Sequence, residues 1–380
     1  LLVNVAAGGA ITETLNLDGG TLDLRSTVAT TLSRPIVLSN DSTITVSNPG
    51  AAVQHVISGE IYALPGSDLT IDGVGGATPS TLVLAPAATT GARWENTTIN
   101  ANGRLQIGTN AGSRGFLGTG NITLNGLLNI STNDNYVIGN NITGGAGGTL
   151  TLSRNSNYLT GDLSGFAGTM LVTSLSTGTN VSVVAELGND TYGNSFGTGA
   201  ITITGNAFAG TSGIASVRTH FNQDITMSNT INLNPAHDGT NAKNAQFIRA
   251  GIGNLTLNGT INLGLTTAGT QRNLIQTEAG GKLFLNATLV GGGANNLLNI
   301  VNNNVTVIGG SASQTYSGVL SGNNVWVFDN AGTTTLTGVN TFNSANNYIR
   351  KGTVAIGTGG VDTIQTVSYT HLTLPTNREV

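Results

Sequence analysis

The feature that most constrains this chain is the internal repetition of a short, strand-like segment. Gly253–Ile261 reads GNLTLNGTI, and Gly281–Leu289, which begins 28 positions later, reads GKLFLNATL. An earlier copy, GNITLNGLL, begins at Gly120, and a looser copy begins at Gly199. Tandem similarity of this kind is typical of solenoids, in which each coil stacks on the previous one.

Within each copy, apolar and polar residues alternate. Leu255 and Leu257 fall on one face of an extended chain, and Thr256 between them falls on the other. The strand then stops at Asn-Gly, at 125–126 and again at 258–259, a dipeptide that accepts positive φ at low cost. Asn-Gly is also a strong hairpin signal, so an antiparallel barrel or sandwich is the alternative. The shortness and tandem similarity of the strands favour a stacked coil.

The composition supports a β-structure. Gly, Thr and Asn together supply 158 of 380 residues, and they are poor helix formers. Charged residues make up only 8%, which suits stacked ladders, because like charges in register repel whereas Asn and Thr hydrogen-bond along the stack. We therefore predict an all-β chain folded as a right-handed, single-stranded parallel β-helix with both ends truncated. Each coil should take roughly 20–28 residues.

Charge and cysteine content exclude several classes of function. The net charge is −4 with 14 Lys and Arg, which leaves no electrostatic basis for binding nucleic acid or acidic membranes. The absence of Cys excludes disulfides, thiol catalysis and thiolate metal sites. No apolar run approaches the ~18–20 residues of a spanning helix. The residues after Leu1 also lack the basic and apolar regions of a signal peptide.

The last residues differ from everything before them. From about Val367 the chain reads VSYTHLTLPTNREV, which resembles the translated sequencing-adapter tail of many metagenomic open reading frames. We therefore expect residues 1–366 to form one β-helical segment and 367–380 to be a non-native tail. An ordinary short C-terminal extension is the alternative.

An ordered series of motifs carries a family resemblance. It runs from TLVL at 81–84 through NTTIN at 96–100 and GRLQIG at 103–108 to GGTLTL at 147–152. This series resembles the passenger-associated repeat of Gram-negative autotransporters, which consists of a GTLTL strand, an Asn-Thr-Tyr turn, a TTI strand and a GTLQIG strand. A second series begins at Gly332, although it has Phe342 where Tyr is usual. The strong matches cover about a third of the chain.

The resemblance implies the passenger domain of a type V secretion system. It implies a non-enzymatic, adhesin-like stalk that is exported through the outer membrane and displayed or secreted. Its Thr/Asn/Gly-rich surface would contact an extracellular glycan, matrix or a sister-cell surface. Full-length members end in a membrane β-barrel translocator, which we expect outside this chain. The alternative is a β-helical polysaccharide lyase or glycosidase with a groove along the rod.

The lyase or glycosidase alternative depends on whether the sequence contains suitably placed carboxylates. A glycosidase requires two carboxylates about 5 Å apart, or wider for inversion, and a lyase requires several acidic Ca²⁺ ligands beside a Lys or Arg. Asp68 and Asp72 share one face of the segment SDLTIDG, and Asp18 and Asp23 flank a Gly-Gly turn. The 18 acidic residues form no cluster in the sequence, so we interpret these four as solvated or turn-forming.

Other motifs match catalytic or binding patterns only in part. Gly193–Gly197 has the letters of the G-x-S-x-G nucleophile elbow, but a strand follows where that motif needs a helix. Gly161–Gly165 echoes the motif of serine-protease passengers without its Asp-Ser pair, and we interpret it as a turn. Gly359–Asp362 is a single copy of a calcium-repeat pattern, and Gly144–Gly148 lacks the Lys of a phosphate loop.

Histidines and large aromatic residues complete the set of candidates. No two histidines have metal-ligand spacing, so we expect them on the surface of strands. Trp326, Phe328 and Tyr316 are expected to fill the core rather than to form a sugar-stacking platform. We predict no catalytic, cofactor-binding or metal-binding residues and no cofactor. The histidines are His55, His220, His237 and, in the tail, His371.

Overall fold

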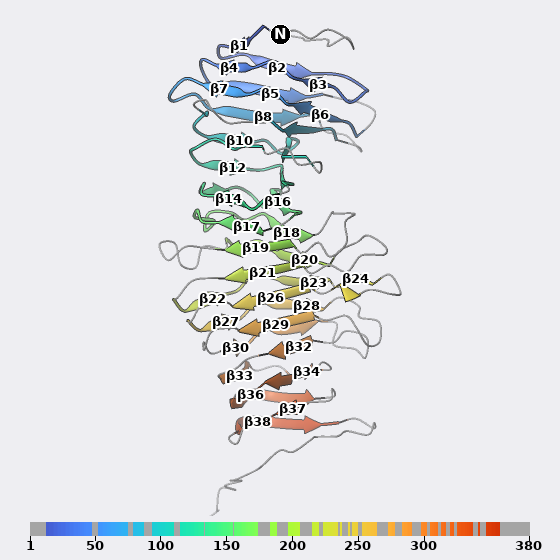
Figure 1. The fold of residues 1–380 in the computed structure, drawn as a ribbon. Helices are drawn as coiled ribbons and strands as arrows, with labels where there is room; N and C mark the ends of the chain where they lie inside the picture. The colour runs from blue at the N-terminus through green and yellow to red at the C-terminus, as the bar shows by residue number, and fades with distance from the viewer. Residues whose placement is uncertain are drawn as a thin grey trace, which may run out of the picture.

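The computed structural model describes residues between 13 and 357 and contains no helix among them. Within that range it leaves out 48–51, 75–78, 87–92, 110–114, 133, 155, 174–182, 188–196, 206–214, 220–222, 235, 238–241, 244, 250–252, 264–272, 278–282, 291–297, 302–304, 311–312, 317–319, 323–324, 337–340 and 343–346. The described strands stack along one axis from the N-terminal end to β38 (Figure 1). Each full coil contributes to three faces.

The first face consists of two parallel sheets that follow one another along the axis. Over the two coils between them, the described residues 93–96 and 115–121 form no strand. The shorter sheet contains β1 (Leu15–Leu17), β4 (Ile36–Leu38) and β7 (Ile61–Ala63). The longer sheet contains β14 (Tyr136–Ile138), β17 (Ser156–Leu159), β19 (Val183–Leu187), β21 (Ala215–Thr219), β26 (Ala245–Arg249), β29 (Asn273–Thr277), β32 (Leu298–Val301), β35 (Leu320–Gly322) and β37 (Thr341–Phe342).

The second face is also divided into two sheets. The N-terminal sheet contains β2 (Thr21–Leu24), β5 (Ser42–Val46), β8 (Leu69–Gly73), β10 (Thr97–Ile99), β12 (Ile122–Leu124) and β15 (Ile142–Thr143). The C-terminal sheet contains β22 (Ile225–Met227), β27 (Leu255–Leu257), β30 (Leu283–Leu285), β33 (Val305–Gly310), β36 (Val325–Leu336) and β38 (Tyr348–Ile356). The last part of β36 pairs with β34 (Gln314–Tyr316).

The third face is one continuous sheet of eleven strands, which is about 48 Å from first to last at ~4.8 Å per step. Its strands are β3 (Thr31–Leu32), β6 (Gln54–Ile57), β9 (Thr81–Leu84), β11 (Arg104–Ile107), β13 (Leu127–Ile130), β16 (Thr149–Leu152), β18 (Thr169–Thr173), β20 (Ile201–Thr204), β23 (Ile231–Asn234), β28 (Thr260–Leu263) and β31 (Thr288–Val290).

The strands of all three faces pair in parallel with the equivalent strands of the neighbouring coils. Among the described residues, antiparallel pairing occurs between β24 (Ala236–His237) and β25 (Ala242–Lys243), which project from the side of the stack. The prediction of an all-β parallel β-helix is therefore confirmed, and the antiparallel alternative is wrong. The right-handed sense of the coil stays a prediction.

Coil length varies more than the sequence suggested. Ile122 pairs with Ile142, 20 positions later, whereas Leu187 pairs with Thr219, 32 positions later. The paired strands contain two to five residues in both the short and the long coil. The additional residues therefore lie in the connections between faces, and the predicted upper limit of 28 is too low.

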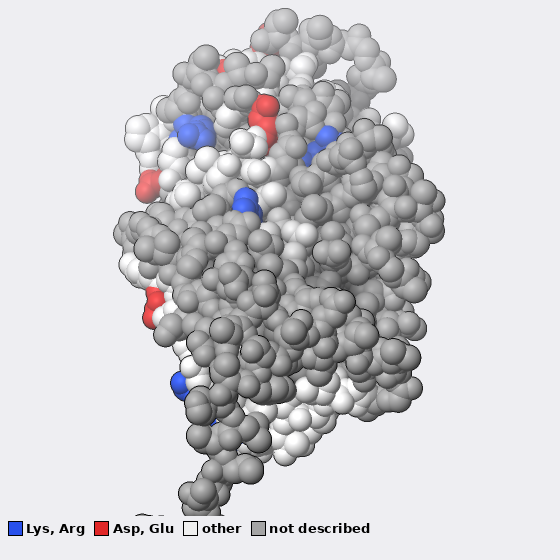
Figure 2. Space-filling view, turned by 60° about the horizontal axis from the view of Figure 1, so that its bottom comes forward, with Lys and Arg blue, Asp and Glu red and all other residues white. Residues whose placement is uncertain are grey.

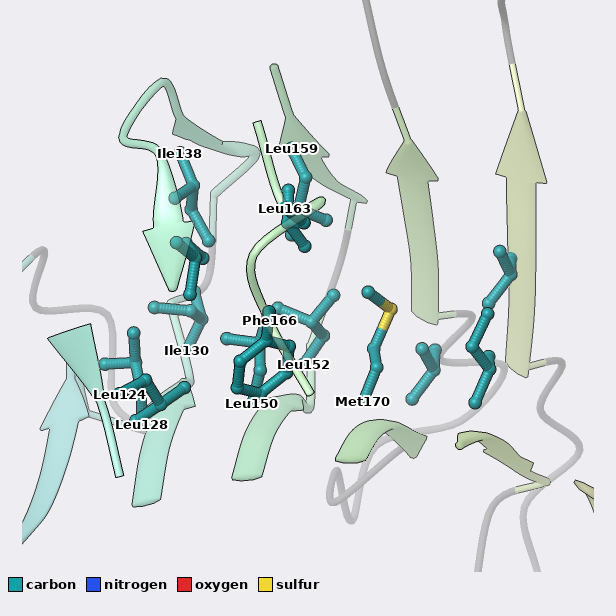
Figure 3. Packing of buried hydrophobic residues seen from close by; sticks show 14 of the residues in the cluster. Leu124, Leu128, Ile130, Ile138, Leu150, Leu152, Leu159, Leu163, Phe166 and Met170 are labelled. Atoms are coloured by element: carbon teal, nitrogen blue, oxygen red, sulfur yellow. The ribbon is translucent and has the colours of Figure 1, made fainter. Parts of the chain in front are cut away.

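Inward-facing aliphatic side chains form columns along the axis, one residue per coil (Figure 3). Burial of each such side chain stabilises the fold by about 1.5–3 kcal/mol relative to exposure. The longest column belongs to the third face, and every member is at most 6% exposed. It contains Leu32, Ile57, Leu84, Ile107, Ile130, Leu152, Val172, Ile203, Leu233 and Leu263.

The Asn-Gly turns use glycine for a reason that the sequence did not indicate. Neither Gly126 nor Gly259 adopts the positive φ that we expected for this dipeptide. A Cβ on Gly126 would instead lie 2.2 Å from the carbonyl oxygens of Asn100 and Gly103 in the preceding coil. At Gly259 the corresponding distance to the carbonyl oxygen of Asn229 is 2.1 Å. Glycine is required there because successive coils approach too closely for a side chain.

Candidate functional site

The outward surface of the second face carries a column of threonines, one from each of six successive coils. Alternation within each strand places these side chains opposite the buried aliphatic residues, as β12 shows with Thr123 exposed between buried Ile122 and Leu124. Parallel pairing aligns each threonine with the next. We call this set the threonine column: Thr21, Thr43, Thr70, Thr98, Thr123 and Thr143.

A ladder of Asp and Asn residues runs beside the threonine column, at the corner where each coil enters the second face. Asn96 donates its backbone N–H and its Nδ2 to Oδ1 of Asp68, at 2.8 and 3.0 Å. The backbone N–H of Asn121 then donates to Oδ1 of Asn96 at 2.9 Å, and that of Asp68 donates to Oδ1 of Asp41 at 2.9 Å. These bonds fix the height of each coil and hence the spacing of the threonines.

The same device recurs further along the chain. Asn254 donates its backbone N–H and its Nδ2 to the carboxylate of Asp224, at 2.8 and 3.0 Å. On the third face, Nδ2 of Asn262 donates to Oδ1 of Asn232, which in turn donates to Oγ1 of Thr202. The abundance of Asn and Thr in the sequence thus reflects hydrogen-bonded ladders between coils, as predicted.

The threonine column presents hydroxyl and methyl groups at a repeat of ~4.8 Å on a sheet surface. Each hydroxyl both donates and accepts hydrogen bonds, and none of the six side chains is ionised. A surface of this kind can hydrogen-bond to a ligand that carries both donors and acceptors. The column would act through many weak contacts rather than one deep site.

The four carboxylates considered above take structural roles. Asp72 lies on the outward face of β8, whereas Asp68 immediately precedes that strand. Asp68 is part of the corner ladder, and Asp72 accepts the backbone N–H of Gly73 at 2.8 Å. Asp23 accepts a hydrogen bond from Ser47 and forms an ion pair with Arg25 at 3.0 Å. Asp18 accepts from Asn40 of the next coil.

The partial motifs divide between described and undescribed residues. Ser164 donates its backbone N–H to Oδ1 of Asp162 at 2.8 Å, which confirms Gly161–Gly165 as a turn. Gly144–Gly148 also contains a turn, closed by Gly148 N–H and the carbonyl of Gly145 at 3.0 Å. Residues 193–196 of the elbow-like motif, Gly359–Asp362 and the tail 367–380 lie outside the described residues.

His55 is the exception among the histidine predictions. It lies inside the coil, with its side chain fully buried, at the column position that Leu82 and Leu105 occupy in the next two coils. Its Nδ1 lies 2.7 Å from Oγ1 of Thr30, and its Nε2 has no partner. Burial lowers the pKa of His55, so the neutral ring is favoured. The expectation of a surface histidine is therefore wrong here, because strand alternation places residue 55 inward.

The remaining histidines and the aromatic residues have simpler outcomes. His220 and His371 lie outside the described residues, and the side chain of His237 is also not described. Trp326, Phe328 and Tyr316 are at most 5% exposed, which confirms that they fill the core.

Charge is sparse across the described surface. Figure 2 shows the described acidic and basic residues of one face as small, separate patches. Within the described part of the chain, no three His, Asp or Glu side chains gather as a metal site would require. Nor does any helix there have the length and apolarity to cross a membrane. The chain matches no family model, and it finds no match among curated proteins or solved structures.

Proposed function

We propose that this chain is a non-enzymatic, adhesin-like stalk from an autotransporter passenger, and that its threonine column binds an extracellular glycan. The stalk would be exported through the outer membrane of a Gram-negative bacterium and displayed on the cell surface or secreted. The proposal combines the motif resemblance described above with the geometry of the second face.

The observation that carries the proposal is the six-coil register of the threonine column. A regular stack of short parallel strands is stiff, because each coil is bonded to both neighbours, and this suits a spacer. A repeated neutral surface suits an elongated ligand that is itself repetitive. Binding strength would then grow with the number of engaged rungs.

The binding part of the proposal is tested with the full chain and a panel of insoluble polysaccharides. The double variant Thr98→Val/Thr123→Val removes two adjacent hydroxyls while keeping β-branched side chains of similar size. We expect at least a ten-fold loss of bound fraction at limiting protein. The matched control is Thr256→Val, an outward threonine in the other half of the second face. Equal binding by all three proteins would contradict the proposal.

The same polysaccharide panel separates the stalk from the lyase or glycosidase. Release of new reducing ends or unsaturated products by the purified chain would show that it is an enzyme. The export step is tested separately by placing the chain upstream of an autotransporter translocator in a Gram-negative host. Protease-accessible chain at the cell surface is the expected result, and retention in the periplasm would contradict it.

A further inference from the structure

The interruption of the first face creates a pocket on the outside of the stack. The sheet that ends at β7 and the sheet that begins at β14 are separated by two coils without a strand in the described residues. A pocket of about 220 Å³ lies there, and three successive coils contribute to it. Its lining residues are Arg93, Phe116, Thr132, Asp134, Asn135, Tyr136 and Val137.

Trp94 packs beneath this break in the first face. Its side chain is 2% exposed and fills the interior, with Nε1 donating to Oγ1 of Thr97 at 2.9 Å. In the next coil, a Cβ on Gly118 would lie 2.6 Å from Cδ1 and Nε1 of the indole. The two coils still hydrogen-bond through Thr119 N–H and the carbonyl of Trp94 at 2.9 Å. The pocket is therefore supported by a packed interior.

The cation of the pocket is held in place and retains donors. The Arg93 guanidinium lies over the ring of Phe116, 5.8 Å from its centroid, and Nη1 donates to the carbonyl of Leu117 at 3.3 Å. An arginine has five N–H donors, so this single hydrogen bond leaves four for a ligand. A guanidinium positioned in this way suits a carboxylate, which accepts two parallel hydrogen bonds from its planar fork.

The other lining groups suit a sugar ring, and they include the carboxylate of Asp134, which can accept hydrogen bonds from sugar hydroxyls. Tyr136 packs against the core, and burial raises its pKa to about 12, while a hydrogen bond with the Leu117 backbone and the charge of Arg93 act in the opposite direction. The phenol is therefore neutral. Exposed Asn135 offers an amide that both donates and accepts, and Val137, which is 63% exposed, offers an apolar edge.

The size of the pocket limits the ligand to one ring. Pockets for drug-sized ligands are usually about 300–1,000 Å³, and this one is smaller. With a net charge of −4, the chain as a whole does not attract long polyanions, so the cation acts locally. We propose that this pocket binds a single uronic-acid residue of a glycan, with its carboxylate on Arg93 and its hydroxyls on Asn135. This inference does not rest on the threonine column.

The test measures binding of D-glucuronate, D-glucose and acetate to the full chain by ligand-observed NMR. We expect glucuronate to bind at least ten-fold more tightly than the other two, because only it has both the ring and the carboxylate. Arg93→Gln should remove this preference, and Arg93→Lys should restore it only in part. Equal binding of acetate and glucuronate, or no binding of glucuronate, would overturn the proposal.

The matched control is Arg104→Gln. Arg104 lines a different pocket of about 210 Å³, at the corner between the second and third faces, together with Gly103, Gly126 and Gly147. This variant should keep the full preference for glucuronate, and loss of it would overturn the assignment to Arg93. Because the side chain of Arg93 is exposed, Arg93→Gln should melt within a few degrees of the parent.

Discussion

The two halves of the second face share an interior and differ in their exterior. Inward positions are mostly aliphatic in both, as Leu124 on β12 and Leu257 on β27 show. The outward column of the N-terminal half is threonine throughout its six coils. In the C-terminal half, the column begins with threonine and then becomes apolar. It contains Thr226, Thr256, Phe284 and Val307, and its next member in register, Val327, is only 4% exposed.

This difference separates what the fold requires from what it permits. The interior must be filled at every level, because a void there loses both transfer energy and packing contacts. The exterior of a strand needs only a residue that fits a pleated surface, and Thr, Phe and Val all do so. The uniform threonines of the N-terminal half are therefore a property that the fold does not demand, and this is why we propose them as the binding surface.

The largest expected effect comes from emptying the shared interior. Leu124→Ala and Leu257→Ala should each lower the free energy of unfolding by about 2–5 kcal/mol, since both side chains are fully buried. Their outward neighbours provide the controls, and Thr123→Ala and Thr256→Ala should stay within about 1 kcal/mol. Urea denaturation with hydrogen exchange at each coil measures both. A loss of less than about 1 kcal/mol for either leucine variant would contradict the claim that both halves depend on a filled interior.

Corner glycines should show the next largest effect. Gly126→Ala places a methyl group against two carbonyl oxygens and should cost about 2–4 kcal/mol. Gly147 lies on the same corner one coil later, where the nearest atom to a Cβ, the carbonyl oxygen of Asn125, is 3.6 Å away. Gly147→Ala should therefore be neutral or stabilise by about 0.4–1 kcal/mol. Equal thermal midpoints for the two variants would contradict the close approach of coils.

His55 should make stability depend on pH, because it is a titratable side chain at a buried position that Leu82 and Leu105 occupy in the next two coils. Its folded pKa is lowered by burial, whereas in the unfolded chain it is about 6.5. The unfolded state therefore binds the proton more readily, and stability is complete above about pH 6.5 and falls as the pH drops below it. In the His55→Leu variant, the thermal midpoint should change less between pH 7.5 and pH 5 than it does in the parent protein. If the thermal midpoint of this variant still varied with pH as it does in the parent protein, other titratable groups would be responsible for the pH dependence.

The smallest effect is expected from exchanging the two exteriors. Phe284→Thr and Thr123→Val each replace an outward residue with one typical of the other half. Because measured strand propensities span only about 1 kcal/mol, we expect a change in melting temperature below about 4 °C. A larger loss for Phe284→Thr would show that the apolar exterior packs against something and is not a free surface.

Repetition made most of the fold predictable. The alternation around Leu255 predicted the strands, the Asn-Gly dipeptides predicted where strands end, and the repetition of this short pattern predicted that the coils stack. The resemblance to autotransporter repeats lies in the same segments, 81–152, that form β9 to β16. Coil length was predicted less well, since the connections between faces carry no alternating pattern.

The surface features were harder to foresee, because they depend on register between coils. Nothing local distinguishes Thr98 from other threonines until the pairing of β8, β10 and β12 aligns it with its neighbours. The pocket at the break joins Arg93, Phe116 and Tyr136 across three coils. His55 could have been found, since it occupies an alternating inward position in QHVI. We expected it on the surface because histidine is a polar residue.

The unequal length of the coils has a practical consequence. A turn of 32 residues follows one of 28 on the first face, from Leu159 to Leu187 and then to Thr219, and the column of paired strands continues through both. Length can thus be added between faces without shifting the levels above or below. Such a rod can accept insertions in the connections of many coils, while the width and the spacing of its stacked strands stay constant.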